Sequence, residues 1–424
     1  MDAEIIAVGS ELVSGQRLDT NSQWLSQRLG EIGIPVHFHT TLGDDLERGL
    51  AALRVAVRRS RLVLITGGLG PTQDDLTREA LAALAGVPLV EDAGCLAAIE
   101  ALFARRCRPM PPRNRVQALV PQGAEPLPNR VGTAPGLWMS HAGAELVALP
   151  GVPSEMKVMY DEQVLPRLRQ RGAGGRVLVH RTINLFGRGE SEIEAQALDL
   201  TARGRRPEVG ITAHDATISF RVSCDGATEE EALRAIEPTL ALIRQRFGDL
   251  IVGEGEGHDV PEALAELLLA QGRTIALAES CTGGLIAARL TAIAGISASF
   301  LGGVVAYANE AKTALLGVPG ELLARHGAVS AEVAEAMAAG ARRRVGADLG
   351  LSVTGIAGPG GGTPEKPVGL VYLGLATAEG VRSRRLDLGP EQPRDVIRSR
   401  AAKHAMNWAR LTLLRRDEPR SATV

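Results

Sequence analysis

The first part of the chain alternates short apolar runs with segments of helical periodicity. The apolar runs are EIIAVG (4–9), PVHFHTT (35–41) and RLVLITGG (61–68), and the helical patterns cover 21–29, 46–58 and 75–85. Strands that alternate with helices pair in parallel and carry helices on both faces of the sheet. The pattern therefore predicts a doubly wound α/β sheet, a fold that places its ligands at the carboxyl ends of the strands.

The chain of 424 residues is too long for one ordinary hydrophobic core. We expect three domains, at 1–170, 175–253 and 258–416. The middle block is predicted to be a small α+β module, with a strand at 181–186, a helix at 190–200, a hairpin within 208–224 and a helix at 229–247. Glycine-rich stretches at 171–175 and 253–259 are predicted to be the linkers.

Bulk properties narrow the function classes. A net charge of −2 gives no global basic field that would attract nucleic acid or a membrane surface. The four cysteines lie far apart without a Cys-x-x-Cys pair, so neither a zinc site nor a disulfide framework is indicated. No apolar run approaches the roughly 20 residues of a membrane span, and the chain starts with acidic residues and a strand rather than a signal sequence. We expect a cytoplasmic protein.

A glycine-rich loop follows the third apolar run, in GGLGPTQDD at 67–75. Backbone amides of Gly67, Gly68 and Gly70, together with a helix start, could cradle a phosphate. Asp74 and Asp75 could hold a divalent cation that bridges phosphate oxygens. The alternative is that both aspartates cap the helix and complement its dipole.

Two further loops carry acidic residues and would meet this one at the same sheet edge. GSELVSG supplies Ser10 and Glu11 after the first strand, and Asp44 follows the second, with Asp45 beside it. Glu11 and Asp44 are candidate metal ligands together with the pair at 74 and 75. Glu155, in LPGVPSEM, is a further acidic candidate.

The stretch from 274 to 312 combines the groups that a serine/lysine amidohydrolase needs. Apolar residues 274–278 predict a buried strand, and the turn at 279–284 delivers Ser280 to a helix start at Leu285. Ser297, Tyr307 and Lys312 follow. Amide hydrolysis requires a nucleophile and a base, and a lysine can be that base when burial lowers its pKa.

Other residues of this block could complete the site. Backbone amides of Gly283, Gly284 or the glycine run at 358–362 could stabilise the oxyanion. Thr354 ends another apolar strand, so its hydroxyl could also face the site. Arg394 is a candidate phosphate clamp, with Arg398 one turn further on. The structural alternatives are that a serine after a strand caps a helix, that Lys312 is solvated, and that Cys281 is a small buried filler.

These motifs resemble a known family. GGLGPTxDD and the order of its neighbouring loops resemble the molybdopterin-binding fold of the MoaB, MogA and MoeA proteins, and more closely the N-terminal half of the CinA family. AESCTGG, LGGVVAYANEAK, GAVSAEVAEAMA, SVTGIAGPGGGTPEKPVG and RDVIRSR resemble the C-terminal CinA domain. The middle block resembles the KH-like module of CinA proteins, although Gly187-Arg188-Gly189 lacks the Gly-x-x-Gly spacing that clamps nucleic acid.

The resemblance implies two activities. One is the deamidation of nicotinamide mononucleotide (NMN) to nicotinic acid mononucleotide and ammonia in the C-terminal α/β domain, without a cofactor. There the family places Ser297 as the attacking serine and Ser280 as its hydrogen-bonding partner, while the residues alone leave the choice between them open. The other is the cleavage of ADP-ribose to AMP and ribose 5-phosphate in the N-terminal domain, with a divalent metal ion (Mg, Mn or Co) held by Asp44, Asp74 and Asp75.

Two features qualify this expectation. Ser10 stands where the molybdopterin-binding relatives usually carry an acidic or amide residue, so fewer carboxylates would surround the metal. The middle module is expected to be a structural or dimerising spacer in a homodimer, without direct contact to nucleic acid or membrane. The alternative function is that of a non-catalytic nucleotide-binding accessory protein in competence or the response to DNA damage.

Overall fold

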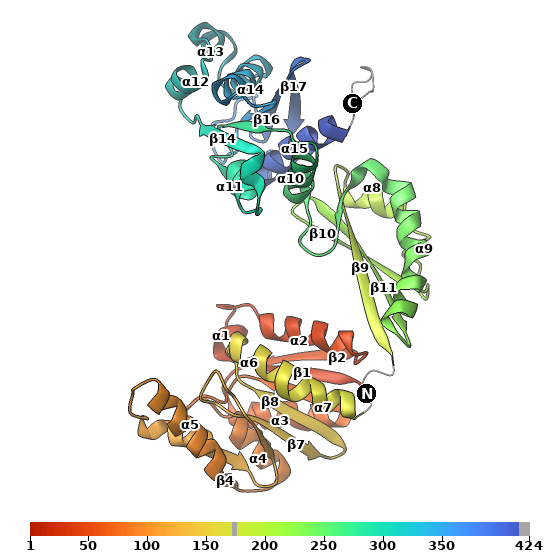
Figure 1. The fold of residues 1–424 in the computed structure, drawn as a ribbon, viewed down its shortest axis with the longest axis vertical. Coiled ribbons are helices and arrows are strands. Elements are labelled where there is room, and N and C mark those ends of the chain that lie inside the picture. Colours follow the sequence, from red (N-terminus) through yellow and green to blue (C-terminus); the bar gives the residue numbers. More distant parts are fainter. Residues whose placement is uncertain (172–175, 415–424) are drawn as a thin grey trace. The chain divides into compact units, whose positions relative to one another are not determined.

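The computed structural model describes residues 1–171 and 176–414 (Figure 1). The chain divides into two compact units, Met1–Val179 with Cys224–Ala235 and His180–Ser223 with Ile236–Val424. The first predicted linker falls mainly on 172–175, which lie outside the described residues.

The first unit contains a six-stranded sheet in the order β2-β1-β3-β8-β7-β6. Its strands are β1 (Ala3–Val8), β2 (Val36–Leu42), β3 (Leu62–Thr66), β6 (Glu125–Leu127), β7 (Gly136–His141) and β8 (Ala144–Leu149). The neighbours β2, β1, β3 and β8 are parallel, while β7 and β6 are antiparallel additions. From β1 the chain moves first to β2 on one side and then to β3 on the other, so the topological switch point, where such sheets bind ligands, lies at β1.

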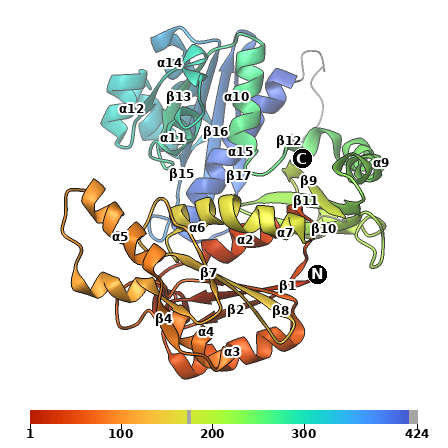
Figure 2. The same cartoon turned by 60° about the horizontal axis from the view of Figure 1, so that its bottom comes forward.

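Helices cover both faces of this sheet, as the alternation predicted (Figure 2). One face carries α2 (Thr20–Glu31) with α6 (Pro153–Met159) and α7 (Leu165–Gln170), and the other carries α3 (Leu46–Arg59) and α4 (Thr77–Ala85). In α3 the buried residues recur at helical spacing, and the Asp45 carboxylate accepts from the Arg48 amide to cap its start. The helix expected at 75–85 begins two residues later, at Thr77. Further elements of the unit are α1 (Ser10–Val13), β4 (Leu89–Glu91), α5 (Ala93–Arg105) and β5 (Leu119–Pro121).

The middle module is a four-stranded sheet in the order β10-β11-β9-β12, with two helices. The elements are β9 (Val177–Phe186), α8 (Glu190–Ala195), β10 (Glu208–His214), β11 (Thr217–Gly226), α9 (Glu229–Phe247) and β12 (Ile251–Glu254). The predicted hairpin and long helix are confirmed, whereas the helix expected to reach residue 200 ends at Ala195. The second predicted linker is partly wrong, because Gly253 and Glu254 belong to β12 and pair with β9.

The C-terminal domain contains a five-stranded sheet in the order β14-β13-β15-β16-β17. The strands are β13 (Ile275–Glu279), β14 (Phe300–Val305), β15 (Leu349–Gly355), β16 (Leu370–Thr377) and β17 (Gly380–Asp387). The first three are parallel, and β16 and β17 extend the sheet as antiparallel strands. Because β13 is followed by β14 on one side and by β15 on the other, its carboxyl end is the switch point of this sheet.

Two hydrophobic cores sandwich the C-terminal sheet. On one face α10 (Val260–Ala270), α11 (Leu285–Thr291) and α15 (Arg394–Leu414) pack through residues such as Leu264, Ile286 and Met406. On the other face α14 (Ala331–Val345) contributes Val333 and Met337, beside α12 (Asn309–Leu316) and α13 (Gly320–His326). The carboxyl end of β13 therefore lies between the helices that cover the two faces of the sheet.

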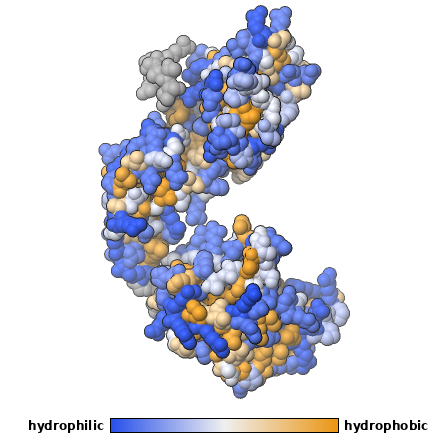
Figure 3. Space-filling view, turned by 180° about the vertical axis from the view of Figure 1, so that it is seen from behind, coloured by the Kyte–Doolittle hydropathy of each residue, from blue (hydrophilic) through white to orange (hydrophobic). Residues whose placement is uncertain are grey.

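The visible surface in Figure 3 is mainly hydrophilic, with hydrophobic residues in smaller groups between. No helix within 1–171 and 176–414 is both long and apolar enough to cross a bilayer.

Candidate active site

Ser280 lies at the switch point of the C-terminal sheet. It follows the last residue of β13, and its amide donates to the Val353 carbonyl oxygen of β15 at 2.9 Å. Its side chain is largely buried, at 8% exposed. The sequence prediction of a buried strand that delivers Ser280 to a helix start is confirmed, with β13 at Ile275–Glu279 and α11 beginning at Leu285.

The turn after Ser280 is held by Glu279, which the sequence reasoning did not single out. The buried Glu279 carboxylate accepts from the amides of Gly284 at 3.0 Å, Ile286 at 3.2 Å and Ala287 at 2.9 Å. These are the unpaired donors at the start of α11, where a carboxylate is stabilised by the helix dipole. The signal in the sequence was a carboxylate at the end of an apolar strand, a few residues before a helix start.

Gly283 and Gly284 are required by the shape of this turn. Both have left-handed backbones, with φ of 62° and 93°. Their amides are already used, because Gly283 donates to the Ser280 carbonyl at 3.0 Å and Gly284 donates to Glu279. The expectation that these two amides stabilise an oxyanion is therefore wrong in this conformation.

Lys312 is a buried amine at the same edge of the sheet. It is 1% exposed, and its Nζ donates to the carbonyl oxygens of Ala306 at 2.9 Å and Tyr307 at 3.0 Å. The expectation of a solvated lysine is therefore wrong. Burial lowers the pKa of Lys312. A neutral lysine amine has two N–H bonds and one lone pair, so it can keep both carbonyl contacts and still accept a proton.

One residue, Ala306, connects Lys312 to the Ser280 turn. The Ala306 amide donates to the Glu279 carbonyl oxygen at 2.8 Å, and the Ala306 carbonyl receives the lysine. Over the residues that the structure describes, no direct hydrogen bond joins Ser280 and Lys312. Catalytic hydrogen bonds often tighten only when the substrate binds, so the geometry is compatible with a nucleophile and its base.

Tyr307 and two arginines line the same edge. Arg394 donates to the Tyr307 hydroxyl oxygen at 3.0 Å and to the Gly358 carbonyl at 2.6 Å. Tyr307 is exposed. Arg398 instead donates to the carbonyls of Cys281 at 3.2 Å and Thr282 at 2.8 Å, which ties α15 to the Ser280 turn. Arg394 is therefore better placed than Arg398 to meet an anion from solvent.

Thr354 and Cys281 are buried next to the site but are not free for catalysis. The Thr354 hydroxyl donates to the Ala328 carbonyl at 2.8 Å, so its expected role in substrate binding is not supported. Burial raises the pKa of the Cys281 thiol to about 12, which leaves it protonated near neutral pH. The interpretation of Cys281 as a small buried residue is supported.

Ser297 lies at the amino end of the parallel strands, whereas Ser280 lies at their carboxyl end. It is exposed and stands in a short 3-10 turn before β14, and the neighbouring Ser299 carbonyl accepts from the Ile275 amide at the start of β13. Because β13 and β14 are parallel, the length of β13 separates Ser297 from Ser280. Five residues of strand correspond to about 15 Å, so within one chain the structure does not bring the two serines together.

In the N-terminal domain the loops after β1 and β2 meet as predicted. Asp44 accepts from the Ser10 amide at 2.9 Å and from the Ser10 hydroxyl at 2.7 Å. The serine at this position therefore acts as a donor to a carboxylate instead of supplying one.

The glycines of the 67–70 loop allow three segments to pack closely. A Cβ would lie 2.2 Å from the Val8 carbonyl oxygen at Gly67, 2.2 Å from the Thr77 hydroxyl at Gly68, and 2.4 Å from the Asp75 carboxylate at Gly70. Beneath the loop the buried Arg78 donates to the carbonyls of Leu69 at 2.7 Å and Gly70 at 2.8 Å. Sequence reasoning missed Arg78, which fixes the loop's backbone from inside.

The four predicted metal ligands are not gathered into a metal site. Asp75 accepts from the Thr72 amide at 2.9 Å and from its hydroxyl, while Glu11 is exposed in α1. Among the described residues, no group of three or more His, Cys, Asp or Glu side chains is placed to hold a metal ion. The residues present therefore do not fit a protein-only cation site. Leu76 precedes α4 without a capping side chain, so Asp74 and Asp75 do not cap the helix either.

A small pocket lies beside this end of the strands of the N-terminal sheet. Asp44, Leu76 and Thr77 line it together with aliphatic side chains of β1, β2, β3 and α3.

Comparisons with known proteins agree with this architecture. The model of the probable molybdopterin binding domain matches residues 4–170, that of the damage-inducible protein CinA KH domain matches 180–253, and that of the CinA C-terminal domain matches 258–413. The fold class is therefore confirmed: an α/β protein with a MoaB/MogA-like N-terminal domain, a KH-like middle module and a C-terminal α/β domain.

Full-length relatives define the family. The chain is 44% identical to a CinA-like protein of Gloeobacter violaceus over 98% of this chain and 96% of that one. It is also 44% identical to a CinA-like protein of Dictyoglomus thermophilum over 98% of this chain and 100% of that one. The chain belongs to the CinA family. Among solved structures, the competence/damage inducible protein of Agrobacterium tumefaciens is 43% identical and covers 37% of this chain and 96% of its own, with a TM-score of 0.35.

Proposed function

We propose that the C-terminal domain is an amidohydrolase that converts NMN to nicotinic acid mononucleotide and ammonia. The observation that carries this proposal is the buried Lys312, bound to the carbonyl of the residue whose amide holds the Glu279–Ser280 peptide. A lysine whose pKa is lowered by burial, at the same end of the parallel strands as a serine at a topological switch point, supports a serine/lysine hydrolase.

The proposed reaction proceeds in two stages. Ser280 Oγ attacks the carboxamide carbon while the Lys312 lone pair takes the hydroxyl proton. The tetrahedral intermediate collapses, the C–N bond breaks, and the lysine ammonium returns its proton to the leaving nitrogen as ammonia forms. Water then attacks the ester with Lys312 again as base, which releases the carboxylate product and restores the Ser280 hydroxyl.

Two further residues have roles in this proposal. The Tyr307 hydroxyl oxygen accepts from Arg394, so its own proton can be donated to the developing oxyanion. The outer face of the Arg394 guanidinium binds the phosphate of the nucleotide, because arginine presents several donors in one plane. Ser297 has no assigned part in a site built from a single chain.

As a second activity we propose that the N-terminal domain cleaves ADP-ribose to AMP and ribose 5-phosphate. The supporting observation is the Ser10–Asp44 contact, which joins two loops beside the 67–70 loop at the switch point of β1. Water would attack a phosphorus atom and the phosphoanhydride bond would break. The divalent metal ion stays a prediction that the placement of Glu11, Asp44, Asp74 and Asp75 does not support.

A nucleotide panel tests both activities against the alternative of a non-catalytic nucleotide-binding protein. The purified chain is incubated with NMN and with ADP-ribose, and ammonia and AMP are quantified. Release of ammonia from NMN supports the amidohydrolase, and release of AMP from ADP-ribose supports the second activity. Binding of both nucleotides without turnover would favour the accessory role instead.

A further inference from the structure

The tip of the β10–β11 hairpin has an unusual backbone. The strands pair as far as His214 and Thr217, so Asp215 and Ala216 form the whole turn. Both have positive φ, 46° and 63°. Such two-residue turns favour Asn-Gly, because a β-carbon is disfavoured in the left-handed region. A strained Asp-Ala turn persists where contacts around it fix its conformation.

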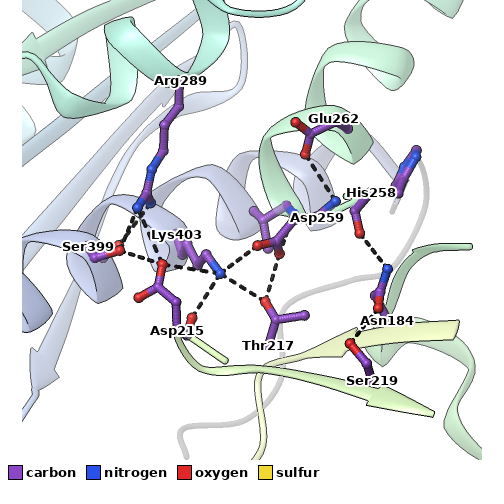
Figure 4. Close-up of polar contacts among 11 residues, drawn as sticks. Asn184, Asp215, Thr217, Ser219, His258, Asp259, Glu262, Arg289, Ser399 and Lys403 are labelled. Atoms are coloured by element: carbon purple, nitrogen blue, oxygen red, sulfur yellow. Dashed lines mark hydrogen bonds and ion pairs between the residues drawn. The ribbon is translucent and has the colours of Figure 1, made fainter. Parts of the chain in front are cut away.

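Those contacts come from two helices of the C-terminal domain (Figure 4). The Asp215 carboxylate accepts from the Ser399 hydroxyl of α15 at 2.6 Å and from Arg289 of α11 at 3.4 Å. Arg289 also donates to the Ser399 hydroxyl at 2.5 Å and to its carbonyl at 3.2 Å. The Asp215 carboxylate, Arg289 of α11 and Ser399 of α15 are therefore all hydrogen-bonded to one another.

A buried lysine anchors the other side of the tip. Lys403, 3% exposed, donates to the Asp215 carbonyl at 2.8 Å and to the Thr217 hydroxyl at 3.0 Å. Its amine also lies 3.3 Å from the Asp215 carboxylate and 2.5 Å from that of Asp259, the capping residue of α10. Arg289 and Lys403 are therefore balanced by Asp215 and Asp259, and removal of either carboxylate leaves a cation undercompensated.

The two helices that meet at Asp215 also hold the Ser280 turn. In α11, Ile286 and Ala287 donate their amides to Glu279, within one turn of Arg289. In α15, Arg398, the neighbour of Ser399, donates to the carbonyls of Cys281 and Thr282. The contact between Arg289 and Ser399 therefore aligns α11, which binds Glu279, with α15, which binds the carbonyls of Cys281 and Thr282.

We propose that Asp215 of the middle module is a positioning residue for the Ser280 site. Through Arg289 and Ser399 it holds α11 against α15 and so keeps the 279–284 turn in register with Lys312. It touches neither substrate nor the reacting atoms. The proposal rests on the deamidation assigned above, and it gives the middle module a role in that reaction.

The test compares two matched substitutions. Asp215→Asn removes the carboxylate but retains the turn, because asparagine readily adopts the left-handed conformation. Asp259→Asn removes the other carboxylate of the same lysine but keeps the cap of α10, and it does not contact Arg289 or Ser399. We expect Asp215→Asn to lower kcat for NMN by about tenfold with KM unchanged, and Asp259→Asn to keep kcat. An unchanged kcat in Asp215→Asn, or an equal loss in both variants, would overturn the proposal.

Amide hydrogen exchange gives a second readout that does not depend on the reaction. The amides of Gly284, Ile286 and Ala287 should exchange faster in Asp215→Asn than in Asp259→Asn or the unchanged protein. Equal protection in the three proteins would refute the positioning role. If the unchanged protein releases no ammonia from NMN, the proposed deamidation is refuted. The exchange experiment still decides whether Asp215 positions the turn.

Discussion

Ser280 and Ser297 lie at opposite ends of the same pair of parallel strands. Ser280 follows the last residue of β13, while Ser297 precedes the first residue of β14, and the Ile275–Phe300 pairing fixes the register between them. Lys312, Tyr307 and Ser280 therefore share one edge of the sheet. Within one chain Ser297 lies at the other end of these strands.

This arrangement predicts that Ser280 is the nucleophile of a site built from one chain. Ser280→Ala should lower kcat for ammonia release from NMN by about 10³-fold or more, because nucleophile and base act as a unit. Ser297→Ala, on an exposed turn, should stay within about twofold of the unchanged protein. Steady-state ammonia assays on both variants make the comparison. Loss of activity in Ser297→Ala alone would show that Ser297 acts from a second copy.

The buried amine predicts a distinct pH dependence. Burial lowers the pKa of Lys312 below its ordinary 10.5, so the neutral base should form at lower pH than on a solvated lysine. We expect kcat/KM for NMN to rise with pH through this lowered pKa and to level off before 10.5. The unfolded chain binds more protons in the same window, so this lysine should also make the free energy of unfolding rise with pH. A rising limb centred on an ordinary lysine pKa would contradict the assignment.

Arg394 should distinguish a nucleotide from a nucleoside. Arg394→Met removes the guanidinium that meets Tyr307 and Gly358, and we expect KM for NMN to rise about tenfold, as for the loss of a charged hydrogen bond. Nicotinamide riboside, which lacks the phosphate, serves as the matched substrate, and its KM should rise much less in Arg394→Met. Equal losses for the two substrates would place Arg394 away from the phosphate.

The Glu279 carboxylate should contribute to the stability of the fold through the backbone hydrogen bonds that it accepts. Glu279→Gln weakens three backbone contacts at the start of α11, and we expect a loss of about 2 kcal/mol in the free energy of unfolding, measured by urea titration. Glu321→Gln, on the exposed start of α13, is the control and should change stability by less than about 0.5 kcal/mol. Similar small effects in both variants would mean that the turn holds without the carboxylate.

Local patterns predicted much of the fold. The alternation of strands and helices over the first 85 residues, the β10–β11 hairpin and the delivery of Ser280 from a buried strand all follow from periodicity and turn chemistry. The start of α4 was placed two residues early, because Thr77 packs against Gly68, a contact that local propensity does not report. Part of the glycine-rich 253–259 stretch forms β12, because pairing with β9 overrides its composition.

The site was predicted by residue type but not by register. Strand order explains why one end of the sheet holds Ser280, Tyr307 and Lys312. Ser297 lies at the other end, because it comes before the start of β14. Backbone hydrogen bonds explain the other differences. The amides of Gly283 and Gly284 and the hydroxyl of Thr354 are polar groups that look available in the sequence, but each already has a partner.

The role of Lys312 as the base of an amide hydrolysis can be tested by replacing its amine. Ammonia release from NMN is followed for the unchanged protein and for Lys312→Met, which keeps an unbranched side chain of similar length in the buried position. We predict that Lys312→Met releases no ammonia above background, while circular dichroism shows a folded chain and AMP release from ADP-ribose continues. Ammonia release at the unchanged rate in Lys312→Met would show that Lys312 is not the base.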